Sequence, residues 1–143
     1  MNDDSERPRY TGRCLCGAVG FSIAGAVEAP VACHCAECAR QSGGVWIAAT
    51  APAERVSITR ERLGWVRVSP KAFRGFCRDC GGFLFWQPVE GETIDVALGA
   101  FDRPHDLTLA AHVHVAEALM TLPDDGLPRY EGEGPGDEPA GSD

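Results

Sequence analysis

The sequence has no long apolar run and no stretch rich in basic residues. Its longest apolar segments, Val45–Ala49 and Phe83–Trp86, are far shorter than the roughly 20 residues that a membrane-spanning helix needs. Met1 is followed by the polar and acidic segment Asn2–Arg7, not by a basic segment leading into an apolar one, so we expect no secretory signal. These absences predict a cytoplasmic protein with no membrane partner.

Basic residues are also outnumbered by acidic ones. The chain has 13 Lys and Arg against 21 Asp and Glu, a net charge of -8. Five of the negative charges lie in the last 13 residues, so the rest of the chain carries about -3. Because there is no run of Lys or Arg, a phosphate backbone would find little attraction, and we predict no nucleic-acid partner.

The composition predicts one folded domain with short tails. A chain of 143 residues, 44% of them hydrophobic, can bury a core of its own. We predict an N-terminal tail over residues 1–10, a folded domain over 11–130 and an acidic, disordered tail over 131–143. The C-terminal tail offers almost nothing that could be buried and so cannot offset its own ordering entropy.

Short runs of β-branched and aromatic residues, separated by Gly and Pro, predict a mainly β domain built from small antiparallel sheets. Only one helix is expected, Ala36–Gln41, which Gly43 and Gly44 would end. The predicted strands are Ala18–Ile23, Val31–Cys33, Val45–Thr50, Val56–Ile58, Trp65–Val68, Phe73–Phe76, Phe83–Trp86, Ile94–Leu98 and Ala111–Val115.

Cysteine is abundant, with seven residues in three clusters. An odd number in a chain without an export signal argues against a disulfide framework and favours metal binding. Cys77 and Cys80 form a C-x-x-C knuckle, and the following Gly81 can take a positive φ. Cys14 and Cys16, two apart in an extended segment, project from the same face. Together the two pairs predict a closed four-cysteine zinc site, which is typical of structural zinc.

The third cluster offers three sulfurs, and no fourth cysteine is left to complete it. Cys33 and Cys35 share a face of an extended segment, while Cys38 returns from the first turn of the predicted helix, whose amide dipoles favour thiolate. Three protein ligands plus one exchangeable position is the arrangement of a catalytic zinc. We therefore predict an open zinc site at this cluster as the place of chemistry.

Other readings of the third cluster stay open. His34, Asp79 or a water could close it as a second structural zinc site, or the three thiols could form a redox cluster without metal. Because His34 lies between two ligands, its ring is expected to point to the opposite face of the segment. His112 and His114, two apart on a predicted strand, suggest a further metal site, but without a third ligand such residues are more often core or surface histidines.

The order C-x-C-G, C-x-C-x-x-C and C-x-x-C-G resembles the glutathione-dependent formaldehyde-activating enzyme family, also called the GFA domain. The resemblance extends from Thr11 to about Tyr130. It is reinforced by the segments Thr11–Val19, Cys33–Gly43, Arg74–Trp86 and Leu98–Asp102.

This resemblance implies a β-tent zinc fold and a carbon-sulfur lyase that forms or cleaves S-(hydroxymethyl)glutathione, with a small thiol such as glutathione as its partner. Members of the family need not all share that activity. An enzyme acting on another thiol adduct and a non-catalytic zinc-binding protein or interaction module of the same fold are the alternatives. The implied cofactor is two Zn²⁺ per chain, a structural ion on Cys14, Cys16, Cys77 and Cys80 and a catalytic ion on Cys33, Cys35 and Cys38.

Residues beside the clusters suggest further roles. Glu37 and His34 are the nearest candidates for moving the hydroxyl proton of the adduct. Arg40, Arg74 and Arg78 could hold substrate carboxylates, although surface arginines with no such role are commoner.

Overall fold

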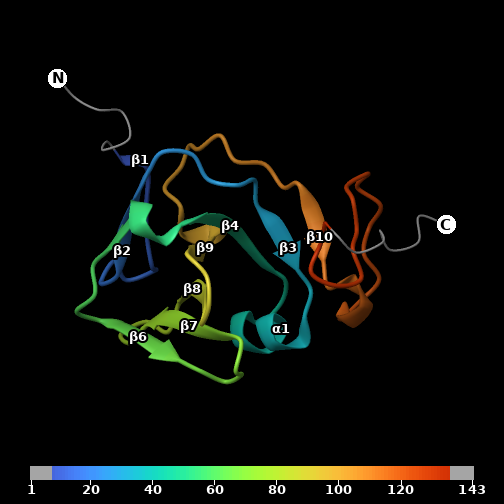
Figure 1. Ribbon diagram of the computed structural model, residues 1–143, viewed down its shortest axis with the longest axis horizontal. Helices are drawn as coiled ribbons and strands as arrows, with labels where there is room; N and C mark the ends of the chain where they lie inside the picture. Colours follow the sequence, from blue (N-terminus) through green and yellow to red (C-terminus); the bar gives the residue numbers. More distant parts are fainter. Residues whose placement is uncertain (1–7, 136–143) are drawn as a thin grey trace. The chain divides into compact units, whose positions relative to one another are not determined.

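The computed structural model describes residues 8–135 and places the chain in two compact units that alternate along the sequence (Figure 1). The first unit comprises Met1–Glu28 and Ala49–Asp106, and the second comprises Ala29–Ala48 and Leu107–Asp143. Each of the two predicted zinc sites falls within one unit, the four-cysteine cluster in the first and the three-cysteine cluster in the second. That residues 11–130 form one domain stays a prediction.

The first unit is built from antiparallel strands. One sheet has the order β1-β2-β5, with bounds Pro8–Arg13, Gly20–Ala24 and Val56–Ile58. In the other sheet, β4 (Trp46–Pro52) lies next to β9, and β8, β7 and β6 follow across the sheet in that order. These four strands span Thr93–Ala97, Phe83–Pro88, Ala72–Cys77 and Leu63–Val66, and the short 3-10 helices η2 and η3 span Ala53–Arg55 and Leu98–Ala100.

Aromatic rings form the centre of the core of this unit. Phe21 on β2 lies edge-on to Phe85 and to Phe101, with ring centroids 5.9 and 5.3 Å apart. Tyr10 on β1 packs against Phe101 in the same way at 5.6 Å. Such edge-to-face contacts add to the free energy gained by burying the rings. They hold β1 and β8 in place, and with them the chain that leads into Cys14.

The second unit is smaller. Strand β3 (Val31–Cys33) pairs with the beginning of β4 in antiparallel fashion and with β10 (Ala111–Val113) in parallel. Helix α1 (Ala36–Ser42) follows β3, and η4 (Val115–Glu117) follows β10. Figure 1 shows β3 and β10 side by side, with α1 beyond the end of β3. Gly43 ends the helix at a φ of 88°, the left-handed conformation that glycine adopts at little cost.

The predicted fold class is confirmed, since the described chain is mainly β with α1 as its one α-helix. Each of the nine predicted strands corresponds to one of β2–β10. The pairing of β3 with β10 departs from a purely antiparallel arrangement because it is parallel. The end of β10 is also earlier than predicted, at Val113, because His114 takes a left-handed conformation with φ 55° and starts η4.

Strand β1 was not predicted, because residues 1–10 were assigned to a tail. Pro8–Arg13 pairs with β2, and its buried residues are Tyr10 and Gly12. Since glycine occupies one of the two inward positions, the apolar alternation that marks a strand is hidden in the sequence. Residues 1–7 of the predicted tail lie outside the described residues.

The predicted C-terminal tail lies partly within the described chain. Residues 136–143 lie outside it, but the Gly132 carbonyl accepts a hydrogen bond from the His114 N–H at 2.7 Å, and Gly134 is buried against Val113. Ordered packing therefore extends to at least Gly134. Among residues 8–135, no helix has the length and apolar character to cross a membrane.

Candidate metal centres

The first candidate centre joins four cysteine sulfurs in the first unit. The Sγ atoms of Cys14, Cys16, Cys77 and Cys80 all lie within 4.8 Å of one another. The Sγ of Cys16 lies 3.7 Å from the Sγ of Cys14 and 3.7 Å from that of Cys77. Four sulfurs bound to zinc at about 2.3 Å would be separated by about 3.8 Å along the edges of the tetrahedron. These separations are too long for a disulfide and fit a zinc ion.

Tight turns place these sulfurs. After β1, the Cys14 N–H bonds to the Val19 carbonyl at 2.9 Å, closing a loop in which Gly17 has φ 84°. At the end of β7, the Gly81 N–H bonds to the Cys77 carbonyl at 2.8 Å, and Gly81 has φ 79°. The positive φ expected at Gly81 is therefore present.

Backbone N–H groups favour thiolates in this four-cysteine cluster. Hydrogen bonds from the N–H groups of Cys16 and Gly82 lower the pKa of Cys80 to about 6. Burial raises the pKa of Cys14, but the Val19 N–H and neighbouring thiols outweigh it, and the net pKa lies below the ordinary value. The Ala18 N–H lowers the pKa of Cys16, but desolvation and the neighbouring sulfurs raise it to about 12. The cluster can thus hold some negative charge by itself, and a cation would favour the ionisation of Cys16 as well.

The second candidate centre joins three cysteine sulfurs in the second unit. The Sγ atoms of Cys33, Cys35 and Cys38 lie within 4.8 Å of one another. Cys33 ends β3, Cys35 is the N-cap of α1, and Cys38 is buried in the first turn of that helix. The Cys35 sulfur accepts a hydrogen bond from the Cys38 N–H at 3.2 Å. Because α1 begins at this point, the strand and the helix together bring the three sulfurs to one place.

Two thiols of this three-cysteine cluster, Cys33 and Cys35, have raised pKa values. A hydrogen bond with Cys38 and burial raise the pKa of Cys33. Burial likewise raises the pKa of Cys35, against the effect of the Cys38 N–H. Thiolates form here when a cation offsets the desolvation of the charge, which is the condition that zinc binding meets.

No other potential ligand in the described chain joins the three sulfurs. Within residues 8–135, the group of atoms that lie within 4.8 Å of one another contains no histidine and no carboxylate. Asp79, a candidate to close the cluster, accepts a hydrogen bond from Arg62 Nε at 2.8 Å. His34, the other candidate, points its Nε2 at His112 instead, 2.9 Å from the Nδ1 of that ring. The residues present therefore fit a zinc ion bound by three protein sulfurs.

His34 belongs to a hydrogen-bonded network. His112, on the neighbouring strand β10, contacts His34 through Nδ1 and lies 2.6 Å from Asp125 Oδ2 through Nε2. Both histidines are buried, and burial is the main cause that lowers the pKa of His34. The sequence analysis considered both histidines but not Asp125, which lies in an exposed turn and has no motif around it.

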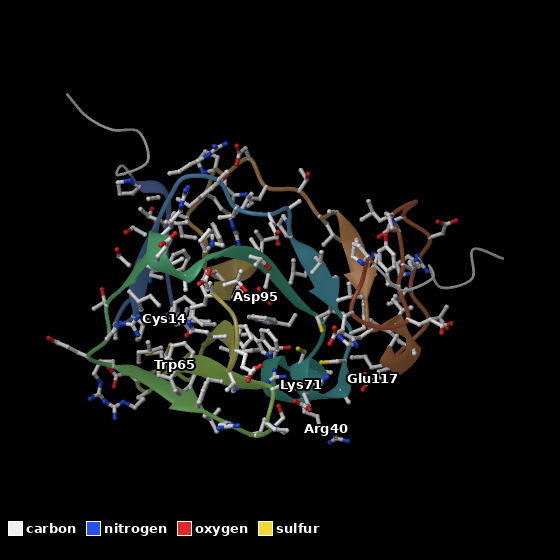
Figure 2. All side chains as sticks on the ribbon, in the orientation of Figure 1. Cys14, Arg40, Trp65, Lys71, Asp95 and Glu117 are labelled. Carbon is white, nitrogen blue, oxygen red and sulfur yellow. The ribbon has the colours of Figure 1, made fainter. Side chains whose placement is uncertain are left out.

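Charged residues near α1 differ in their surroundings. Glu117 on η4 accepts a hydrogen bond from the Ala36 N–H at 3.3 Å, a contact that the sequence analysis missed. Figure 2 shows Glu117 beside α1 and Arg40 extending outward from that helix. Glu37 is exposed in the first turn of α1.

The other two candidate arginines lie in the first unit. Arg74 is buried, with its guanidinium over the Phe83 ring at 5.7 Å from the ring centroid. Arg78 is exposed and donates to the Glu61 carbonyl at 3.1 Å. Of the three candidate arginines, Arg40 alone belongs to the unit that carries the three-cysteine cluster.

Comparison with known proteins agrees with the arrangement of the cysteines. The family described as "Glutathione-dependent formaldehyde-activating enzyme", or GFA, matches residues 9–117. A crystal structure of a Rhodobacter sphaeroides protein, solved as a structural genomics target, is similar with a TM-score of 0.54 and 24% identity. The similarity covers 70% of this chain and 99% of that one, and it shows the fold alone. No curated protein matches the chain. Because the family match takes in all seven cysteines, the chain belongs to the GFA family.

Proposed function

We propose that this protein is a zinc-dependent carbon-sulfur lyase that forms or cleaves S-(hydroxymethyl)glutathione, or a related thiol adduct, at the three-cysteine cluster. In this proposal the four-cysteine cluster holds a structural zinc, and Cys33, Cys35 and Cys38 hold a catalytic one. The membership of the chain in the GFA family supports this reaction class.

One observation carries the proposal. Three sulfurs converge within 4.8 Å, and no other ligand atom of residues 8–135 joins them. Tetrahedral zinc takes four ligands, so three protein sulfurs leave one position for a ligand from outside. The four-cysteine cluster has no such position. This difference is our reason for proposing a structural zinc there and a catalytic zinc at the three-cysteine cluster.

The residues of the second unit would prepare the site for a thiol. Cys33 and Cys38 are fixed by β3 and α1, so the position that they leave open has a defined direction. A zinc ion bound here would stabilise the thiolate form of an incoming thiol. Cys38 is buried and Cys33 and Cys35 are half-buried, which limits the access of water to the sulfurs. Arg40, exposed in the last turn of α1, is a candidate to bind a carboxylate of the substrate.

The proposal is tested by asking whether glutathione places its sulfur on the metal. We expect glutathione to add a sulfur to the zinc X-ray absorption spectrum and a new charge-transfer band after cobalt substitution. S-methylglutathione, which has no thiol, is the matched ligand control and should leave both spectra unchanged. Turnover of S-(hydroxymethyl)glutathione and of a panel of other thiol adducts then identifies the substrate.

A different result would favour the alternative of a non-catalytic zinc protein. If glutathione leaves the metal spectra unchanged at millimolar concentration and no adduct of the panel turns over, the three-cysteine cluster is a second structural site. Turnover of another adduct, with none of S-(hydroxymethyl)glutathione, would keep the lyase class and replace the substrate.

A further inference from the structure

Strand β6 forms a free edge in the first unit. It pairs with β7 in antiparallel fashion, and within residues 8–135 no strand lies on its other side (Figure 1). A free edge presents unpaired backbone groups with which another extended chain can pair. The residues around β6 therefore decide whether this edge is closed to partners or suited to one of them.

The hydrogen-bond register shows which backbone groups of β6 face outward. The Arg78 N–H donates to the carbonyl of Arg62, the residue before β6, at 2.8 Å. In an antiparallel pair, hydrogen-bonded and non-hydrogen-bonded residue pairs alternate. Gly64 and Val66 therefore bond to β7, whereas the N–H and C=O of Trp65 point away from it. Nothing in the part of the chain that the structure describes bonds to these two groups.

Gly64 allows a positive charge carried by the chain after β7 to reach this edge. A Cβ added at Gly64 would lie 2.9 Å from Arg78 Cγ, so the stem of Arg78 lies against the β6 backbone at this position. The Arg78 guanidinium then donates to the carbonyl of Glu61, in the turn before β6, at 3.1 Å. Arg78 is exposed, and no carboxylate of the described chain pairs with it.

Two further arginines flank β6. Arg67 follows the strand, and its guanidinium lies over the Phe73 ring at 5.4 Å from the ring centroid. Arg60 precedes the strand, and both arginines are exposed and form no ion pair with residues 8–135. Arg62 differs from them because its Nε donates to Asp79 at 2.8 Å. The free edge thus lies between positive charges that have no carboxylate partner.

These charges favour one kind of partner. A second copy of β6 would bring like charges together across the new strand pair, which is unfavourable. A nucleic acid would neutralise the arginines, but it would not supply the alternating N–H and C=O groups of an extended backbone. An acidic peptide supplies both the carboxylates and the backbone groups.

We propose that the β6 edge binds an acidic segment of another protein, which adds to the sheet as an extended strand. The backbone of the segment would pair with the N–H and C=O of Trp65, and its carboxylates would lie beside Arg60, Arg67 and Arg78. This interaction is independent of the proposed lyase function, because the edge belongs to the first unit and the three-cysteine cluster to the second.

The choice of partner is tested by calorimetric titration of the full-length, zinc-loaded protein. The probe is a short peptide in which Glu and Val alternate, blocked at both ends, and its control is the same peptide with Lys in place of Glu. We expect the Glu peptide to bind and the Lys peptide not to bind. A short single-stranded DNA should bind more weakly than the Glu peptide. Equal binding of the two peptides, or tighter binding of the DNA, would overturn the proposal.

Variants locate the binding surface. Arg67→Gln and Arg78→Gln should each weaken binding of the Glu peptide about threefold, the effect of losing one exposed ion pair. Arg103→Gln is the matched control, because Arg103 is an exposed arginine of the same unit outside the surroundings of β6. All three variants should keep the wild-type zinc content. Wild-type affinity in both Arg67→Gln and Arg78→Gln would place the peptide elsewhere and overturn the proposal.

The addition of a strand is measured at the Trp65 amide. Its hydrogen exchange, followed in ¹H–¹⁵N spectra, should be fast in the free protein and about tenfold slower near saturation with the Glu peptide. The amides of Gly64 and Val66 already bond to β7 and should change little. Binding without protection of Trp65 would mean that the arginines attract the peptide without strand pairing, and it would overturn the proposal.

Protection of the Trp65 amide in the free protein would overturn it as well. If this protection disappears on dilution, a second copy of the chain occupies the edge. If it disappears when residues 136–143 are removed, the acidic end of the chain itself is the occupant.

Discussion

Among single residues, Gly12 shows how closely the core of the first unit is packed. A Cβ added at Gly12 would lie 2.3 Å from the Ala100 carbonyl oxygen and 2.3 Å from Phe21 Cζ. The oxygen belongs to the backbone of η3 and the carbon to a packed ring, so a side chain at Gly12 must displace both. Glycine is required at this position of β1 by this close approach and not by its φ angle.

Gly12→Ala should therefore destabilise the protein. Overpacking of this kind costs about 1–3 kcal/mol of unfolding free energy, and chemical denaturation of the zinc-loaded protein measures it. Gly99→Ala is the matched control, because a Cβ there would meet no atom within 4 Å. Equal unfolding free energies for the two variants would contradict the packing described for β1.

Cys80 tests the role assigned to the four-cysteine cluster. Serine at this position leaves the zinc one sulfur short, and the energy of a closed structural site is folding energy. We expect Cys80→Ser to lose one zinc ion and at least about 3 kcal/mol of stability, or about 10 °C in melting temperature. Asp79→Asn, beside it in the same turn, should keep both zinc ions. A soluble Cys80→Ser protein with wild-type stability would show that the cluster does not organise the fold.

Among the elements, α1 allows metal binding to be separated from helix formation. Cys35 is both the N-cap of α1 and a proposed zinc ligand, and its sulfur accepts from the Cys38 N–H. Serine is a preferred N-cap residue, so Cys35→Ser should keep the helix while removing one sulfur. Zinc content should fall to about one ion per chain, with circular dichroism and melting temperature close to wild type.

The same variant should lose the glutathione signal in the metal spectra. Ser42→Ala is the matched control, because Ser42 lies at the other end of α1, where it bonds to the Cys38 carbonyl at 2.7 Å. It should keep two zinc ions and the signal. If Cys35→Ser unfolds as severely as Cys80→Ser, Cys33, Cys35 and Cys38 form a second structural site.

The elements that the sequence predicted well are those whose side chains repeat with a clear period. Strand β5 was predicted with its observed bounds because Val56 and Ile58 lie on either side of one polar residue. Strand β1 was missed because its inward positions hold one aromatic residue and one glycine. The early end of β10 depends on the left-handed φ of His114, a conformation that is uncommon for residues other than glycine and that no local pattern indicates.

The residues of the candidate sites also differ in whether the sequence could predict them. Both cysteine groups could be predicted because metal ligation fixes residue type and short spacing together. Asp125 could not, since its contact with His112 depends on how a turn folds back against β10, where the His112 N–H bonds to the Pro128 carbonyl. An acidic residue in an exposed turn has no feature in the sequence that separates it from its neighbours.

For the whole molecule, the seven cysteines predict the metal content. Four sulfurs in one unit and three in the other lie at separations that fit one zinc ion each. Elemental analysis of the purified protein should therefore find about two zinc ions per chain. A value near one would remove the basis for an open site, and a value near zero would leave both clusters without their proposed cofactor.

The two clusters should also release zinc at different pH values. A thiol binds zinc after losing its proton, so the thiol with the higher pKa is reprotonated first as the pH falls. A hydrogen bond with Cys38 and burial raise the pKa of Cys33, and burial raises that of Cys35. In the four-cysteine cluster the pKa of Cys16 is also raised, to about 12, but those of Cys14 and Cys80 are lowered. Because the three-cysteine cluster also has one ligand fewer, it should lose its zinc at the higher pH.

A metal-sensitive dye can follow this release as the protein is titrated from pH 8 to pH 5. We expect two steps of one zinc ion each, with the melting temperature falling mainly in the second step, because the closed site contributes folding energy. In Cys35→Ser the first step should be absent and the second unchanged. Release of both ions in a single step would mean that the two clusters hold zinc equally strongly. Loss of stability in the first step would mean that the three-cysteine cluster also organises the fold. Either result would contradict the division into a structural and a catalytic ion.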